Sequence, residues 1–150
     1  MFDFFKKKSS EPDPYYLLLD KLNTIEAEKP EEFDPYNELF ISCMVGIYVR
    51  KVDAYRDFFK MFSEKDLSPD EWRSIQEGFE LEKEGLDWAL EIEHTMDDIL
   101  FFAQEGVLQS DLKKKIPDAN PQHITNICKR FEADGMIKRE KRGSTYFITR

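Results

Sequence analysis

Residues 109–149 carry the clearest sequence pattern of the chain. This stretch contains the segments QSDLKKKI (109–116), ITNICKRFEADGMIKR (124–139) and GSTYFIT (143–149). Apolar residues recur at helical spacing in the first two segments, which predicts a short helix and then a helix from Pro121 to Asp134. Gly135 stands where a left-handed helix cap is expected. Two short strands follow, joined by the tight turn 142–144, and together they predict a β-hairpin.

The order of these elements predicts a winged helix-turn-helix. The same three segments resemble the MarR-type and related winged-helix transcriptional regulators. In that family a "QSEL" helix precedes a recognition helix that ends in Leu-Glu-x-x-Gly-Leu-Ile, and a basic wing ends in an aromatic strand and Thr. The resemblance covers about residues 91–150. It implies a DNA-binding regulator of bacterial or phage type.

The sequence departs from the family pattern at three places. Leu108 stands where Thr or Ser usually caps the QSEL-like helix, and the turn 117–120 is one residue longer than usual. MarR-type regulators also add helices after the wing that help to form their dimer, whereas this sequence ends at Arg150. We therefore expect a homodimer that forms through the N-terminal helices.

The predicted helices share a small core, which leaves the polar side chains of the last helix facing outward. The core residues are expected to be Ile99, Phe102, Leu112, Ile116, Ile124, Ile127 and Phe131. An exposed helix fits the major groove of DNA, where amides read adenine and basic side chains read guanine or hold phosphate. The expected contacts from this helix are Gln122, His123, Thr125, Asn126, Lys129 and Arg130.

The predicted hairpin supplies a second set of contacts. Its basic side chains suit phosphates or the edge of the minor groove, and Gly143 lets the backbone approach closely. The expected contacts from the hairpin are Lys138, Arg139, Lys141, Arg142 and Ser144. Lys113, Lys114 and Lys115 add positive charge beside the groove-entering helix.

The charge of the chain is divided unevenly. The formal net charge is −9, from 22 basic and 31 acidic residues. Residues 111–150 hold ten basic and five acidic residues, a net charge of +5, whereas residues 1–110 carry −14. We expect the acidic part to point away from bound DNA, because charges within about 8 Å are poorly screened at physiological salt.

Prolines mark the predicted helix starts in the rest of the chain. At four places a capping residue precedes a proline that would take the first helical position: Asp13-Pro14, Asp34-Pro35, Ser68-Pro69 and Asn120-Pro121. They predict helices at 14–29 and 35–62, and a third from 69 that is either continuous to about 104 or broken near Gly85. The fold class is therefore mainly α with a small β-hairpin wing. We expect a flexible N-terminus (1–12), an acidic helical region for dimerisation or partner binding (13–88) and the winged helix (89–150).

Other functional classes find less support in the sequence. Asp97 and Asp98 have no nucleophile, histidine base or glycine-rich phosphate loop beside them, so we expect no enzyme and no cofactor. Metal binding by the Glu91–Asp97 cluster is disfavoured because no second histidine lies at helical spacing. We expect no membrane contact and no small-molecule ligand, and we expect Cys43 and Cys128 to be buried thiols of a cytoplasmic protein. The alternative is an adaptor protein in which the winged helix is a structural module and the acidic helices bind partners.

Overall fold

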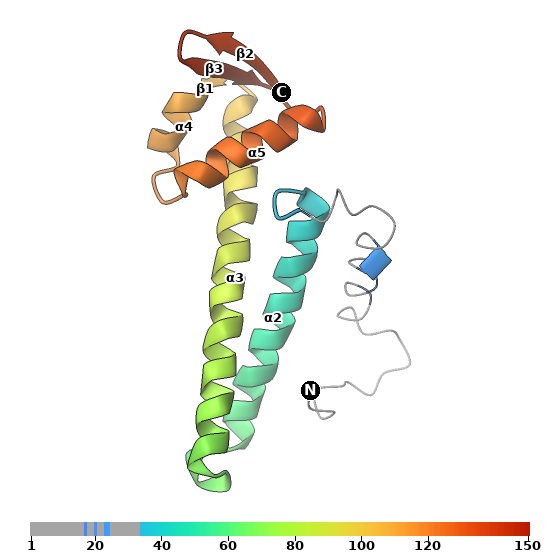
Figure 1. Cartoon of the computed structure of the whole chain (residues 1–150), viewed down its shortest axis with the longest axis vertical. Coiled ribbons are helices and arrows are strands. Elements are labelled where there is room, and N and C mark those ends of the chain that lie inside the picture. Colours follow the sequence, from blue (N-terminus) through green and yellow to red (C-terminus); the bar gives the residue numbers. More distant parts are fainter. Residues whose placement is uncertain (1–16, 18–19, 21–22, 25–33) are drawn as a thin grey trace. The chain divides into compact units, whose positions relative to one another are not determined.

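The computed structural model describes residues 34–150 together with Leu17, Asp20, Asn23 and Thr24. The elements are α2 (Glu38–Met61), a 3₁₀ helix η3 (Glu64–Asp66), α3 (Pro69–Ala103), β1 (Val107–Leu108), α4 (Gln109–Lys115), α5 (Pro121–Ala133), β2 (Lys138–Arg142) and β3 (Thr145–Thr149) (Figure 1). A mainly helical chain with a small sheet near its C-terminus confirms the predicted fold class. Leu17, Asp20, Asn23 and Thr24 are helical; the rest of the helix expected at 14–29, and the expected flexible segment 1–12, lie outside the described residues.

The described chain divides into two compact units. The helical unit comprises Ser42–Ala89, and the C-terminal unit comprises Leu90–Arg150 together with Asp34–Ile41. The last of these segments comes from the part of the sequence that we had placed in the acidic helical region. Asp34 and Tyr36 of this segment contact α5 of the same unit.

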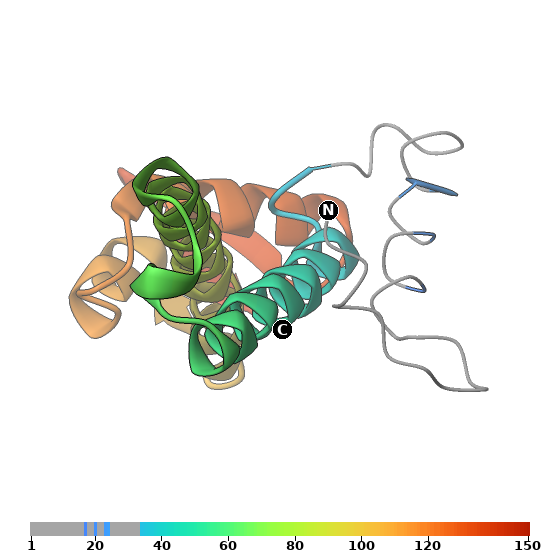
Figure 2. The same ribbon diagram turned by 90° about the horizontal axis from the view of Figure 1, so that it is seen from below.

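In the helical unit, α2 and α3 lie side by side and run in opposite directions (Figures 1 and 2). The Phe59 ring contacts the Trp72 ring, with 5.5 Å between their centres, and Lys51 pairs with Glu82 at 3.6 Å. A Cβ atom at Gly85 would overlap the Tyr48 ring, so this glycine allows α2 and α3 to approach closely. Helix α3 continues through Gly85, which settles the two possibilities in favour of a single helix.

Two of the predicted helix starts are confirmed and one is wrong. The Ser68 hydroxyl accepts a hydrogen bond from Glu71 N at 3.2 Å, and the Asn120 side chain accepts one from Gln122 N at 2.9 Å. Helix α2, however, begins at Glu38 and is capped by Asn37, whose side chain accepts from Phe40 N at 3.1 Å. The Asp34 carboxylate instead accepts from Tyr36 N at 2.7 Å, because short polar side chains also stabilise turns. Residues 34–37 therefore form a separate turn.

The C-terminal unit has the helix, strand, helix, helix and hairpin order of a winged helix-turn-helix. Its sheet has the order β1-β3-β2, and both strand pairs are antiparallel, with Val107 opposite Ile148 and Arg139 also opposite Ile148. All the predicted core residues are buried except Phe102, which is half-buried beneath Lys115. Within the described residues, no helix combines the length and apolar character that crossing a membrane requires.

Candidate nucleic-acid interface

The hairpin is tied to the two helices of the helix-turn-helix by side-chain hydrogen bonds. The Thr145 hydroxyl accepts a hydrogen bond from Ser110 N at 3.1 Å, in the first turn of α4. Leu108 precedes this helix and offers no capping side chain, so the strand β3 supplies the acceptor that the local sequence lacks. The departure from the family pattern at Leu108 is therefore compensated by a residue 37 positions later in the chain.

Arg139, which we expected to contact DNA, is held inside the C-terminal unit. Its side chain is only 7% exposed. It donates hydrogen bonds to Glu132 of α5 and Gln109 of α4, both at 3.3 Å, and its guanidinium lies 3.9 Å from the centre of the Tyr146 ring. Arg139 thus joins α4, α5 and the wing, and a structural role accounts for all of these contacts.

The outer part of the wing remains open to solvent. Lys138, Lys141 and Ser144 are exposed, and no ion pair involves either lysine within the described residues. Arg142 lies 3.9 Å from the centre of the Phe147 ring and pairs with Glu140 at 3.5 Å. Gly143 has a positive φ of 62°, and a Cβ atom there would meet nothing within 4 Å. The tip therefore offers positive charge and an unobstructed backbone.

The polar residues of α5 are distributed over two neighbouring flanks of the helix. Gln122, Thr125 and Lys129 share one flank, whereas His123, Asn126 and Arg130 share the other, about 100° further round the helix. Lys129 is exposed and makes no ion pair within the described part of the chain. We call these two sets the open flank and the covered flank.

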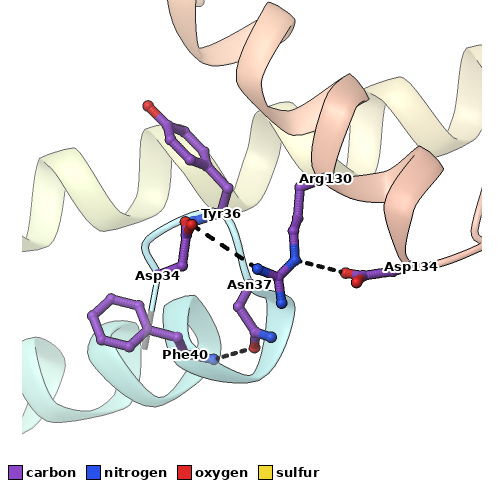
Figure 3. Close-up of polar contacts among 6 residues, drawn as sticks. All are labelled: Asp34, Tyr36, Asn37, Phe40, Arg130 and Asp134. Atoms are coloured by element: carbon purple, nitrogen blue, oxygen red, sulfur yellow. Dashed lines mark hydrogen bonds and ion pairs between the residues drawn. The ribbon is translucent and has the colours of Figure 1, made fainter. Parts of the chain in front are cut away.

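The covered flank contacts the 34–37 turn of the same unit. Tyr36 Oη lies 2.9 Å from His123 Nδ1 and accepts a hydrogen bond from Asn126 Nδ2 at 3.2 Å. Arg130 reaches between Asp34 of the turn and Asp134 at the end of α5, with N–O distances of 4.0 and 3.0 Å (Figure 3). The contacts of Asp34 and Tyr36 with α5 join residues about 90 positions apart, so no local pattern in the sequence could have indicated them.

Helix α4 adds a further exposed basic group. Lys113, Lys114 and Lys115 lie in its last turn, and Lys115 Nζ is 5.2 Å from the centre of the Phe102 ring. With Lys129 of α5 and the lysines of β2, the exposed cations come from three elements of the unit. Because phosphates are bound by such cations and bases by amides and hydroxyls, these side chains have the chemistry that a nucleic acid requires.

Glu91 has a structural role at the turn between α4 and α5. Glu91 Oε1 accepts a hydrogen bond from Asn120 N at 3.0 Å and so fixes the turn between α4 and α5. A hollow of about 330 Å³ lies beside it, lined by polar residues that include His94, Asp98 and Lys115. Among the residues that the structure describes, no three His, Cys, Asp or Glu side chains are grouped to hold a metal ion.

Cys128 lies on the inner face of α5, beneath the candidate interface. The prediction that both cysteines are buried is confirmed, and neither forms a disulfide. Burial raises the pKa of the Cys128 thiol to about 12, while the nearby Arg139 charge partly opposes this shift and Glu132 adds to it. The thiol is therefore an apolar packing group at neutral pH and not a nucleophile.

The residues predicted from the sequence thus separate by their surroundings. On the open flank and the wing, Thr125 is half-buried and the other predicted residues are exposed: Gln122, Lys129, Lys138, Lys141, Arg142 and Ser144. By contrast, His123, Asn126, Arg130 and Arg139 make contacts within the C-terminal unit. Comparisons of the chain with protein-family models, with curated proteins and with solved structures gave no match.

Proposed function

We propose that the protein is a DNA-binding transcriptional regulator that contacts duplex DNA through the open flank of α5 and the tip of the wing. In this proposal α5 enters the major groove, where Gln122 and Thr125 face the bases. Lys129, Lys138, Lys141 and Arg142 hold phosphates on either side. Lys113 and Lys114 extend the phosphate contacts from α4.

The observation that carries the proposal is the exposed positive charge on α5 and the wing. Lys129 of α5 and Lys138 and Lys141 of β2 are all exposed and lie outside the ion pairs described there. A hairpin that only packs in solvent does not require several exposed basic side chains. In a DNA-binding surface such side chains have a use, because each contact of a cation with a phosphate releases counterions and strengthens binding.

The helical unit carries a net negative charge, unlike the exposed cations of α5 and the wing, and has a different proposed role. Ser42–Ala89 contains seven basic and eleven acidic residues. Like charges repel, so this unit would weaken DNA binding if it lay on the duplex. We assign it to homodimerisation or partner binding in a cytoplasmic regulator, and we assign no catalytic activity to the protein.

The test is a titration of the full chain against random duplex DNA, followed by fluorescence anisotropy, at about 50 and about 200 mM salt. Wild-type protein should bind and lose affinity steeply with salt. The variant Lys141→Ala/Arg142→Ala should bind weakly, and its slope of log affinity against log salt should be smaller by about 2, since each phosphate contact contributes about 0.9.

The matched control is Lys60→Ala/Lys65→Ala, which removes the same charge from exposed positions of the helical unit and its connecting segment. It should bind as tightly as wild-type protein. Equal loss in both double variants would show that only total charge matters. No binding by folded wild-type protein at the lower salt concentration would refute the proposal.

A second candidate function is supported by the contact between α5 and the 34–37 turn. One flank of α5 already holds an acidic and aromatic peptide turn. An adaptor that binds such segments of partner proteins would use the same surface, with the winged helix as a structural module. The anisotropy titration separates the two functions, because an adaptor of this kind needs no affinity for DNA.

A further inference from the structure

We propose that the 34–37 turn is an intramolecular latch that competes with duplex DNA for α5. This inference rests on the proposed DNA-binding function and adds a form of regulation to it. The latch would lower the affinity of the resting protein, and its release would expose the covered flank. A binding surface of moderate charge would then gain three further contact residues: His123, Asn126 and Arg130.

A chain of hydrogen bonds holds the latch against α5. Gln122 Nε2 donates to Asn126 Oδ1 at 3.1 Å, and Asn126 Nδ2 donates to Tyr36 Oη at 3.2 Å. The Tyr36 hydroxyl also forms a hydrogen bond with His123 Nδ1 at 2.9 Å, in which the tautomer of the ring decides the donor. The side chains of Gln122, Asn126 and His123 are therefore linked to Tyr36 in one chain of hydrogen bonds.

The latch also places a negative charge beside Arg130. Arg130 lies between the carboxylates of Asp34 and Asp134, at 4.0 and 3.0 Å, as Figure 3 shows. The Asp34 carboxylate occupies a position beside Arg130 that a phosphate oxygen would otherwise take. A phosphate that approaches Arg130 would meet this negative charge, so the turn opposes DNA both by contact and by repulsion.

The latch can open without unfolding its neighbours. The first helical hydrogen bond of α2 runs from Ile41 N to Asn37 O, so the backbone of residues 34–36 lies outside the helix. Asp34 remains 40% exposed at its side chain. Polar contacts that water can reach are individually weak, so a polyanion that gathers several phosphate contacts can displace them.

The test compares three variants of the full chain in the anisotropy titration. Asp34→Asn removes the carboxylate beside Arg130, and Tyr36→Phe removes the hydroxyl without any change of charge. Glu38→Gln is the matched control, because it removes one exposed negative charge from the adjacent first turn of α2. Asp34→Asn should tighten DNA binding by about fivefold and Tyr36→Phe by about threefold, the scale of one or two exposed polar contacts, while Glu38→Gln stays near wild type.

A coupling measurement distinguishes the latch from a general charge effect. In an Arg130→Gln background, Asp34→Asn should no longer tighten binding, because the residue that it releases is missing. The salt slope of Asp34→Asn alone should be steeper by up to about 0.9, one additional phosphate contact. An equal gain from Asp34→Asn and Glu38→Gln, or a gain that survives in the Arg130→Gln background, would overturn the proposal.

Nuclear magnetic resonance of the two histidine rings measures the latch without DNA. The ring resonances of His123 should shift in Tyr36→Phe, while those of the exposed His94 serve as an internal reference. Unchanged His123 resonances would overturn the latch. Binding by wild type with no gain in the variants would refute the latch and leave the proposed function intact. No binding by wild type or by any variant would refute the proposed function and the competition with it.

Discussion

Arg139→Ala should destabilise the C-terminal unit, although the residue lies in a run of basic side chains that sequence alone assigns to DNA contact. The substitution removes a hydrogen bond to the Glu132 carboxylate, one to Gln109 and the stacking on Tyr146. A hydrogen bond to a charged group contributes about 1.5–3 kcal/mol and a neutral one about 1 kcal/mol. Cation–π contact contributes about 0.5–2 kcal/mol.

These contributions cannot simply be added, because the same side chain makes all three contacts and Glu132 is 44% exposed. Water therefore weakens the ion pair, and we discount it to about 1 kcal/mol. The expected loss is about 2–3 kcal/mol of unfolding free energy. It should be measured by urea denaturation, followed by circular dichroism and by hydrogen exchange of amides in β3.

Lys141→Ala is the matched control for this prediction. Lys141 lies two residues further along β2, on the same face of the strand, and is exposed. Its removal should change stability by less than about 0.5 kcal/mol, as for surface substitutions in general. Equal stability of the two variants would refute the structural role of Arg139. A weaker DNA affinity of folded Arg139→Ala, with no loss of stability, would restore the residue to the DNA-binding surface.

Three further predictions concern the packing of α3, the pH dependence of stability and the assembly. Gly85→Ala should destabilise the helical unit by about 1 kcal/mol in urea denaturation, because overlap with Tyr48 costs more than the gain in helix propensity. In a Tyr48→Ala background the same substitution should stabilise the unit. A change of unfolding free energy with the same sign in both backgrounds would contradict this packing. Unfolding exposes the Cys128 thiol, which then ionises above pH 9.0 while the folded thiol stays protonated to about pH 12. The stability should therefore fall by about 1.4 kcal/mol per pH unit in that window through this group, a contribution that Cys128→Ala should lack. Light scattering should give the mass of a dimer, which Leu81→Glu disrupts and Phe101→Glu leaves intact. The two side chains are matched in exposure, at 67% for Leu81 and 65% for Phe101. Loss of the dimer in Phe101→Glu alone would contradict assembly through the helical region.

The elements whose signals are local could be predicted from the sequence. The capping box at Ser68 and the cap at Asn120 each depend on a side chain and a backbone group two or three residues away. The helix start predicted at Asp34-Pro35 was wrong because Asp34 and Asn37 are both good capping residues. Only the fold of the unit decides that Asn37 caps α2 while Asp34 holds a turn.

The surroundings of the site residues were harder to predict. The alternation of strand residues places Arg139 on the same face as the buried Ile137, and this signal could have marked it as an inward-facing side chain. The contact of Tyr36 with His123 and Asn126 has no such signal, because it joins residues 87 and 90 positions apart. Such contacts depend on tertiary packing, which one sequence does not encode in any local pattern.

The central claim is that duplex DNA contacts the open flank of α5 and the tip of the wing. The most direct measurement is a titration of isotope-labelled protein with a short duplex, followed by amide resonances. We expect shifts of the amide resonances of Gln122, Thr125, Lys129 and residues 141–144, while the amides of Ser42–Ala89 stay unaffected. Changes confined to the helical unit, or no changes at a duplex concentration that saturates other DNA-binding proteins, would contradict it.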